Sequence, residues 1–241
     1  SRNHRENDDV DDADNVRRER NMVGGRRGGS LRVHNFHDLL DNKTQKIQLL
    51  KYFKKGNFMK KITLLGDSIR LYGYGKTVEE RFVKDGFTVF QPEDNCRFAK
   101  YTLRMLFDLK NNIEGSEVIH WNNGLWDVCN LFGDGCFTDV SEYVSCMSRI
   151  ADNLLKITDK VIFATTTPVC DDYPYQTNED IDRYNKAVVP ILKDKGVMIN
   201  DLFTVVYPRR SELLLPDKLH LNEEGAKICA DKVTNAIKKL L

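Results

Sequence analysis

Five short apolar runs, separated by longer amphipathic segments, constrain the fold of this chain more than any other feature. The runs are Ile62–Leu65, Phe87–Phe90, Val118–Trp121, Val161–Thr165 and Val197–Ile199. Apolar residues recur at helical spacing over Val78–Asp85, Phe98–Leu109, Val140–Ile157, Ile181–Asp194 and Glu223–Leu240. Strands that are each followed by a helix are typical of parallel sheets joined by right-handed crossovers. The pattern predicts a three-layer α/β/α sandwich around a five-stranded parallel sheet.

The amino-terminal residues, from 1 to about 36, differ in composition from the rest of the chain. The stretch "ENDDVDDADNVRRERN" is dense in charge, and "VGGRRGGS" is a basic linker rich in glycine. Such a stretch buries too little apolar area to offset its ordering entropy. We expect it to be partly disordered, or to be an addition to the natural chain. A basic arm that binds nucleic acid is the alternative, which the interleaved acidic residues weaken.

A second amino-terminal segment has a different pattern. Its apolar residues lie at the spacing of one helix face: Leu39, Leu40, Ile47, Leu50 and Phe53. This spacing predicts an amphipathic helix over residues 38–55. Met59 then begins a Met-Lys-Lys sequence that runs directly into the first apolar run, as a natural start would. We therefore divide the chain into an extension, residues 1–58, and a globular domain, residues 59–241.

Charge is spread unevenly between these two parts. The chain of 241 residues has a net charge of +1 and is 41% hydrophobic, which suits one domain with a sizeable core. Residues 1–58 hold 13 Lys and Arg against 9 Asp and Glu, whereas residues 59–241 hold 24 against 27. A mildly acidic domain gives no reason to expect a nucleic-acid partner. No apolar run approaches the roughly 20 residues of a membrane span.

The cysteines argue against a metal site and against secretion. All six are scattered, with no Cys-x-x-Cys motif and no Cys/His cluster. Zinc sites need tighter spacing, and disulfide frameworks belong to small secreted chains. The sequence also lacks a secretory signal pattern at its amino terminus. We expect free thiols in a reducing, cytoplasmic compartment, with no metal and no cofactor.

The strand-to-loop junctions are the places to look for function, because ligands gather at the carboxyl ends of parallel strands. The first apolar run stops at the letters GDS, which end in Ser68. These residue types suit either an ordinary turn or a nucleophile held at the end of a strand. The third run leads into Asn122 and Asn123, whose amides suit a pocket for a ligand oxygen. An ordinary Asn-Gly turn beside packed tryptophans is the alternative there.

The carboxyl-terminal loop contains a third candidate. Asp217 precedes His220 by three residues, before a helix that Asn222 can cap. An aspartate at this spacing can accept the imidazole Nδ1–H, which fixes the tautomer and leaves Nε2 free as a base. Two solvent-exposed loop residues are the alternative when the motif is taken alone.

Taken together, these motifs resemble those of the SGNH (GDSL-type) hydrolases. The resemblance spans Met59 to Leu241 and is carried by "LLGDSIR" and "PDKLHLNEEGAKICADKV". It implies a flavodoxin-like SGNH hydrolase fold and hydrolysis of esters without a metal or a cofactor. It also assigns Ser68 as the nucleophile, His220 as the base and Asp217 as the residue that orients the base.

The resemblance implies an oxyanion hole, but this chain departs from the family pattern there. One donor is the backbone N–H of Ser68. Cys96 stands where the family has a glycine, and its backbone N–H is expected to serve in the same way. The family's third motif, usually G-x-N-D, is replaced by "WNNGLWD". We favour Asn123 as the side-chain donor, with Asn122 as the alternative.

Three further residues are candidates for binding substrate. Arg70 and Arg97 lie within two residues of a catalytic candidate, and Trp126 follows the asparagines. Surface ion pairing and simple packing are the alternatives for these side chains. Tyr72 and Tyr74, with Trp126, are also candidates for a platform under a sugar ring.

The function that these expectations support is a serine esterase that removes small acyl groups, acetyl above all, from small-molecule or carbohydrate esters. A lysophospholipase or thioesterase is the alternative within the family, with the loop Leu125–Val140 as part of an apolar groove or a lid. A non-catalytic binding module on the same fold is the alternative outside it. The sequence gives no indication of the oligomeric state.

Overall fold

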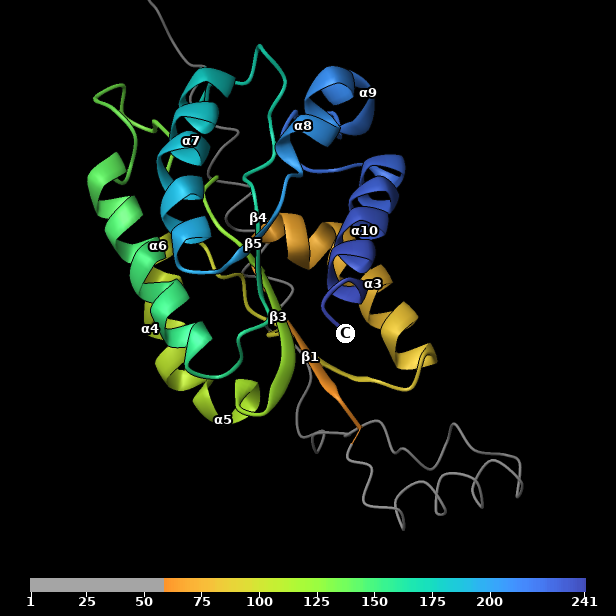
Figure 1. The fold of residues 1–241 in the computed structure, drawn as a ribbon. Coiled ribbons are helices and arrows are strands. Elements are labelled where there is room, and N and C mark those ends of the chain that lie inside the picture. Colours follow the sequence, from red (N-terminus) through yellow and green to blue (C-terminus); the bar gives the residue numbers. More distant parts are fainter. Residues whose placement is uncertain (1–58) are drawn as a thin grey trace, which may run out of the picture. The chain divides into compact units, whose positions relative to one another are not determined.

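A computed structural model describes residues 59–241 of the chain (Figure 1). The extension over residues 1–58, with the helix expected over 38–55, lies outside the described residues and remains a prediction. All six cysteines fall within 59–241, and all are free thiols, as predicted. Within the same range, no helix is both long and apolar enough to cross a membrane.

The domain is built on a five-stranded sheet with all strands parallel and in the order β2-β1-β3-β4-β5. The strands are β1 (Lys61–Leu65), β2 (Thr88–Phe90), β3 (Ser116–Asn122), β4 (Val161–Ala164) and β5 (Met198–Asn200). Each overlaps one of the apolar runs, so the predicted sheet is confirmed. This strand order reverses direction between β1 and β3, the position where open α/β sheets place their ligand sites.

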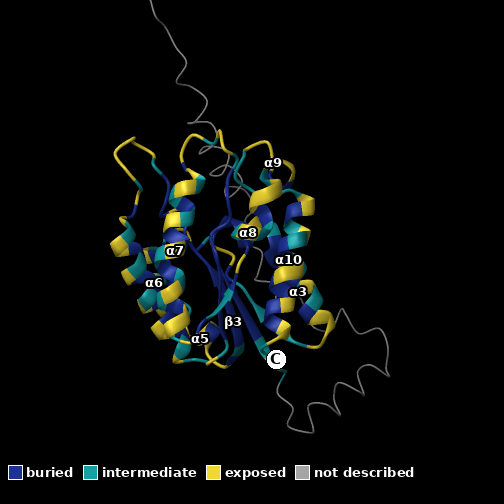
Figure 2. Cartoon of the chain, turned by 45° about the horizontal axis from the view of Figure 1, so that its top comes forward, coloured by how far each residue is buried: buried dark blue, intermediate teal, exposed yellow. Residues whose placement is uncertain are grey.

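Helices cover both faces of the sheet, which confirms the predicted three layers (Figure 1). On one face lie α3 (Gly75–Lys84) and α10 (Glu223–Lys238). On the other lie α4 (Ala99–Asp108), α6 (Val140–Leu155) and α7 (Asn178–Asp194). Figure 2 shows the buried residues in the strands and on the inward sides of these helices. Strands covered on both faces are apolar throughout, which explains the continuous runs in the sequence.

The long helices of the second half begin at side-chain caps that the sequence supplies. Asp139 accepts the Ser141 N–H at the start of α6, and Thr177 accepts the Asp180 N–H at the start of α7. Asn222 caps α10 by accepting the Gly225 N–H at 2.9 Å, as predicted. Such caps satisfy backbone donors that a helix leaves unpaired at its first turn.

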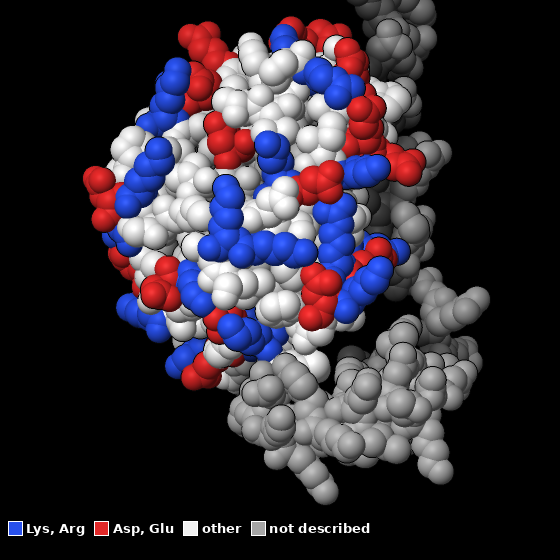
Figure 3. Space-filling view, turned by 45° about the vertical axis from the view of Figure 1, so that its right-hand side comes forward, with Lys and Arg blue, Asp and Glu red and all other residues white. Residues whose placement is uncertain are grey.

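Charged side chains of both signs lie on the face formed by α3 and α10 (Figure 3). Two ion pairs link these helices: Arg81 with Asp231 at 2.7 Å, and Lys238 with Asp85 at 3.2 Å. All four side chains are about a third exposed or more. Exposed pairs of this kind are each worth at most about 1 kcal/mol, so the buried core stabilises the fold far more than they do.

Several short helices were not predicted from the sequence. They are η1 (Ile69–Tyr74), α5 (Lys110–Ile113), α8 (Phe203–Val206), η2 (Tyr207–Arg209) and α9 (Arg210–Leu213). The first of these matters most for function. It has π-helical hydrogen bonding, begins immediately after Ser68 and continues into α3. π-Helical turns occur frequently at functional sites.

Gly124 lets the loop after β3 pass close to β4. Its φ is 141°, and a Cβ at this position would lie 2.0 Å from Thr166 Oγ1, which donates to the Asn123 carbonyl at 2.8 Å.

Gly124→Ala should therefore lower the free energy of unfolding by about 3 kcal/mol, measured by urea denaturation. Gly133→Ala is the matched control, because Gly133 also has a positive φ, 73°, but has no atom within 4 Å of the added Cβ. It should cost only about 1 kcal/mol of backbone strain. Equal losses in the two variants would refute the packing argument.

Candidate active site

Ser68, His220 and Asp217 meet at the carboxyl end of the sheet, in one chain of hydrogen bonds. Ser68 follows β1 at the start of η1, and the other two residues lie in the loop between α9 and α10. Ser68 Oγ lies 2.9 Å from His220 Nε2, and His220 Nδ1 lies 2.8 Å from Asp217 Oδ2. The structure therefore brings the three predicted catalytic residues together. In this arrangement the imidazole can take the serine proton while the carboxylate holds the ring.

Backbone hydrogen bonds fix the loop that carries the histidine. Asp217 Oδ1 accepts the N–H groups of Leu219 and His220, both at 3.0 Å. The Leu215 N–H donates to the His220 carbonyl at 2.7 Å, which closes the loop on itself. Partial burial raises the pKa of Asp217, but these N–H donors and the imidazole outweigh it, so the pKa lies below its ordinary value. Asp217 is thus ionised at neutral pH, as an orienting carboxylate must be.

A buried polar network lies beneath the nucleophile. Asp67 Oδ1 accepts the Ile69 N–H at 2.9 Å and the Asn122 Nδ2–H at 2.7 Å. Tyr74 donates its hydroxyl to Asn122 Oδ1 at 2.7 Å. Burial raises the pKa of Asp67, against the lowering effect of its hydrogen bond from Asn122. This network ties the turn before Ser68 to the end of β3.

Gly66 makes that network possible. A Cβ on Gly66 would lie 2.0 Å from Asn122 Oδ1, so the Asn122 side chain occupies the space that any other residue at position 66 would need. The glycine of the GDS motif is therefore required by the close approach of β1 and β3. This is a tertiary reason for a residue that the sequence alone explains equally well as part of a turn.

Cys96 is bound to the same glycine and does not present its backbone N–H to a ligand. That N–H donates to the Gly66 carbonyl at 3.1 Å, while the Gly66 N–H donates to Cys96 Sγ at 3.2 Å. Burial raises the pKa of the Cys96 thiol. The structure thus differs from the predicted oxyanion role of Cys96. The next residue, Arg97, has a left-handed backbone, with φ of 49°.

The two asparagines face opposite layers, as successive residues of a strand do. Asn123 is fully buried, and its Nδ2 donates to the Arg97 carbonyl at 2.9 Å and to Thr102 Oγ1 at 2.8 Å. Both of its amide hydrogens are therefore engaged within the protein. A carbonyl can only accept, so the contact with Arg97 fixes which way the amide points. Among the described contacts, Asn122 uses one of its two amide hydrogens, on Asp67.

The three residues predicted to bind substrate have different surroundings. Arg70 is fully buried, and its guanidinium donates to the carbonyls of Gly66, Pro92 and Asp94 and to the side chain of Gln91. It therefore anchors the loop after β2 and is not open to a substrate, which corrects the prediction. The Arg97 guanidinium is exposed and lies 4.8 Å from the centre of the Tyr101 ring. Trp126 is 40% exposed.

Tyr72 is the residue next to the triad whose position the sequence did not specify. Its ring lies 6.2 Å from the His220 ring, centre to centre, at an angle of 72°. Tyr72 lies four positions after Ser68, the spacing at which helical side chains share a face. This spacing is visible in the sequence, but it brings Tyr72 close to Ser68 only when a helix begins directly after the serine.

Asp127 joins the loop after β3 to α4. Both of its carboxylate oxygens lie within hydrogen-bond distance of the Ala99 N–H, at 3.1 and 3.0 Å, at the first residue of that helix. Burial raises the pKa of Asp127 to about 7. The carboxyl group thus connects the Asn123 loop to the segment that holds Cys96 and Arg97.

The sequence of the chain is similar to that of a known protein. No family model matches the chain. Over 161 residues it is 27% identical to the GDSL esterase/lipase WDL1 of Oryza sativa subsp. japonica. This stretch covers 60% of the chain and 62% of that protein, so the chain spans less than two thirds of the length of its curated relative.

The fold of the chain is similar to the folds of several solved structures. The chain is similar to a lipase/acylhydrolase from Enterococcus faecalis, with a TM-score of 0.61, 21% identity, and coverage of 75% of this chain and 96% of that one. It is also similar to a GDSL-like lipase from Bacteroides thetaiotaomicron, with a TM-score of 0.60, 17% identity, and coverage of 80% and 98%. This is the SGNH hydrolase fold. An acetyl xylan esterase, AlAXEase, shares the fold with a TM-score of 0.62, 22% identity, and coverage of 73% and 98%.

The predicted resemblance to the GDSL-type hydrolases is confirmed by these comparisons. The structural likenesses are all below 25% identity, and they establish the SGNH hydrolase fold of the chain without establishing its reaction. The rice relative has an esterase/lipase name, which is a property of that protein. The reaction of this chain therefore has to be argued from its own residues.

Asp127 should make the stability of this domain depend on pH. Its pKa is about 7 in the folded state against 3.8 as the ordinary value, so the folded state holds this proton more tightly. The resulting stabilisation is complete at pH values below 3.8 and is lost as the pH rises to about 7. Relative to Asp127→Asn, the wild type should lose up to about 4 kcal/mol between about pH 4 and pH 8. Urea unfolding of both proteins across this range measures the difference, and a difference that stays constant would contradict the assignment.

Proposed function

We propose that this protein is a serine esterase that hydrolyses esters of small acyl groups through a covalent acyl-enzyme. The observation that carries the proposal is the continuous hydrogen-bonded chain from Ser68 through His220 to Asp217, with 2.9 and 2.8 Å between successive heavy atoms. A serine hydroxyl is a weak nucleophile until a base takes its proton, and this chain supplies the base and its orienting carboxylate.

The reaction then runs in two stages. Ser68 Oγ attacks the ester carbonyl carbon while its proton passes to His220 Nε2. The tetrahedral intermediate collapses, the bond to the alcohol oxygen breaks, and the imidazolium gives its proton to that oxygen. In the second stage a water molecule repeats the attack on the acyl-enzyme, with His220 again as the base, and the carboxylic acid leaves. The ionised Asp217 stabilises the imidazolium in both stages.

The oxyanion formed in each stage needs preorganised donors. The Ser68 N–H lies at the first turn of a helix, where backbone donors have no partner within the helix and the helix dipole favours negative charge. Asn122 suits the role of second donor better than Asn123 does. One amide hydrogen of Asn122 has no partner among the described contacts, whereas both of those of Asn123 are engaged. Cys96 acts indirectly, since its N–H and Sγ hold Gly66.

Acetyl esters, including those of carbohydrates, are the substrates we propose. Solved structures with this fold include acetylxylan esterases, among them Axe2 from Geobacillus stearothermophilus, with a TM-score of 0.61 and 14% identity over 74% of this chain. Fold similarity does not fix a substrate, but it shows that this scaffold accommodates acetylated carbohydrates in other proteins.

A lysophospholipase or thioesterase is the second candidate, and one observation favours it. The loop between β3 and α6 exposes four large apolar side chains: Trp126, Leu131, Phe132 and Phe137, at 40, 50, 79 and 52%. Exposed apolar groups of this size are typical of surfaces that contact apolar ligands. A series of p-nitrophenyl esters from acetyl to octanoyl separates the two candidates, because only an enzyme for long chains gains rate with acyl length.

Ser68→Ala should abolish hydrolysis of p-nitrophenyl acetate while circular dichroism shows an unchanged fold, because the nucleophile is lost and only one oxygen atom is removed. A fluorophosphonate probe should label the wild type and not this variant, which also distinguishes an esterase from a binding module. Ser145→Ala is the control, since Ser145 lies on the exposed side of α6. Retained turnover or labelling in Ser68→Ala would overturn the assignment.

Removing the side-chain oxyanion donor should lower kcat far more than it changes KM. Asn122→Ala is expected to lose about 3 kcal/mol of transition-state stabilisation, roughly 100-fold or more in kcat. Tyr74→Phe is the control, because it removes the hydroxyl bonded to Asn122 but leaves the amide donor in place. Asn123→Ala should act mainly on the free energy of unfolding. A selective fall of kcat in Asn123→Ala instead would assign the donor to that residue.

A further inference from the structure

The ring of Tyr72 is exposed beside the catalytic histidine. Tyr72 is 69% exposed, although its position on η1 puts it one helical turn after Ser68. Its ring meets the His220 imidazole edge to face, at 6.2 Å between centres. A large aromatic ring that contacts a catalytic group and remains open to solvent is suited to covering a ligand, because it offers apolar area at little entropic cost.

The direction of proton transfer indicates which part of the ester lies near this ring. In the proposed reaction His220 Nε2 gives its proton to the leaving alcohol, so the alcohol oxygen must come within hydrogen-bond distance of that nitrogen. The acyl oxygen lies instead at the oxyanion donors, which come from the Ser68 backbone and from Asn122. Tyr72 contacts the imidazole, which is the group that meets this alcohol oxygen. Its ring therefore borders the alcohol side of the site.

We infer that Tyr72 forms the alcohol subsite and that this subsite receives a sugar ring. The inference rests on the proposed esterase function and adds to it the residue that binds the alcohol. Tyr72 would be a binding residue, in contact with the leaving group, and would take no part in proton transfer.

The chemistry of Tyr72 favours a hydroxylated ring over an alkyl chain. Its ring is largely exposed and ends in a hydroxyl. A sugar ring has a C–H face that packs on an aromatic face and hydroxyl edges that hydrogen-bond with a phenol, whereas an alkyl chain needs continuous apolar surface.

The test separates the alcohol from the acyl group. We would measure kcat/KM for peracetylated methyl xylopyranoside, ethyl acetate and ethyl butyrate with wild type, Tyr72→Ala and Tyr72→Phe. Tyr72→Ala should lower kcat/KM for the acetylated xyloside by about tenfold, the scale of a lost aromatic contact, and leave both ethyl esters within twofold. Tyr72→Phe should keep most of the activity on all three, because the ring remains.

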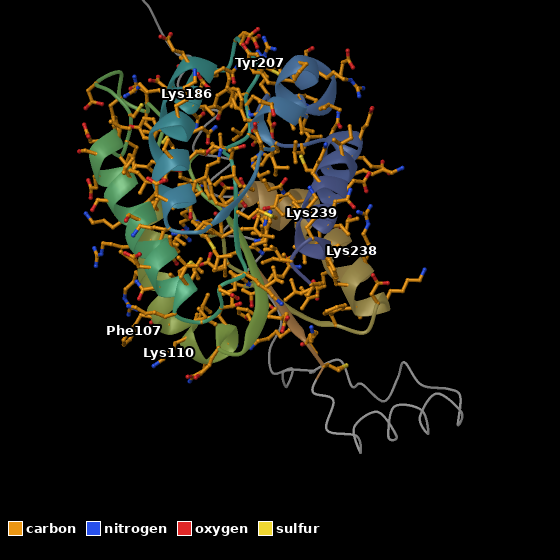
Figure 4. All side chains as sticks on the ribbon, viewed as in Figure 1. Phe107, Lys110, Lys186, Tyr207, Lys238 and Lys239 are labelled. Carbon is orange, nitrogen blue, oxygen red and sulfur yellow. The ribbon has the colours of Figure 1, made fainter. Side chains whose placement is uncertain are left out.

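Phe107→Ala is the matched control. Phe107 is 77% exposed, lies on α4, and occupies the opposite end of the domain in Figure 4. Its removal should change none of the three rates. An equal loss on all three esters in Tyr72→Ala would mean that the ring only positions His220. A change in the ratio of acetate to butyrate would place Tyr72 on the acyl side, and either result would overturn the inference.

A binding measurement keeps this inference distinct from the esterase proposal. Methyl xylopyranoside, the alcohol without its acetyl groups, should bind Ser68→Ala protein, detected by saturation-transfer NMR. Binding should be lost in the Ser68→Ala, Tyr72→Ala double variant and kept in the Ser68→Ala, Phe107→Ala variant. Sugar binding that depends on Tyr72 without any ester hydrolysis by the wild type would refute the esterase alone. Hydrolysis that needs Ser68, with sugar binding absent or independent of Tyr72, would refute the subsite alone.

Discussion

The hydrogen bond between Ser68 Oγ and His220 Nε2 joins residues that are 152 positions apart in the chain. Contacts elsewhere in the domain fix the position of each of these two residues. At the serine end, β1 and β3 run side by side in the middle of the sheet, with Leu65 opposite Trp121. Gly66, the residue directly after β1, lies against Asn122, and the lack of a side chain there allows the two strands to stay in register. Asn122 then binds Asp67, so the turn that carries the nucleophile is fixed to the neighbouring strand.

The histidine end is fixed by local bonds rather than by the sheet. Lys218 has a left-handed backbone, with φ of 67°, and its N–H donates to the Leu215 carbonyl. A non-glycine residue in this conformation costs free energy, and it persists where the surrounding contacts over-determine it. Here the Asp217 side chain accepts two backbone N–H groups of its own loop, so the carboxylate both shapes the loop and orients the imidazole. The same residue thus determines where the imidazole lies and how its ring is oriented.

The sequence predicts the parts of this protein that depend on neighbouring residues in the chain. Strands buried on both faces give continuous apolar runs, and the spacing of Asp217 and His220 is local, so the fold class and the pairing of these two residues follow from patterns. The oxyanion region depends on distant partners and does not follow. Whether the Cys96 N–H is available depends on the Gly66 carbonyl, thirty residues earlier, to which it donates. Arg70 is a cation of a type that is rarely buried, yet its two terminal nitrogens donate in the core to carbonyls from the loop after β2.

The domain buries two carboxyl groups, those of Asp67 and Asp127, at positions where apolar side chains could pack. Burial raises the pKa of both Asp67 and Asp127, and burying such groups destabilises a fold unless hydrogen bonds compensate. Asp67, in the turn before Ser68, binds the end of β3, and Asp127, in the loop after β3, binds the start of α4. Apolar residues at these positions would pack without any directional bond. The carboxyl groups fix the distance and angle between segments, which a reaction that depends on placing an oxyanion between donors requires.

In the proposed reaction η1, which begins immediately after Ser68, would also link chemistry to recognition. Its N-cap residue, Ser68, would supply the nucleophile and an N–H for the oxyanion, and Tyr72 holds an exposed ring beside the His220 imidazole. The acyl group and the alcohol of an ester would therefore be contacted by two positions on one rigid element, four residues apart. Because the Tyr72 ring is largely exposed, substitution there removes little core packing and leaves the acyl side intact. Selectivity for the alcohol can consequently change at this position without disturbing the bond between Ser68 and His220.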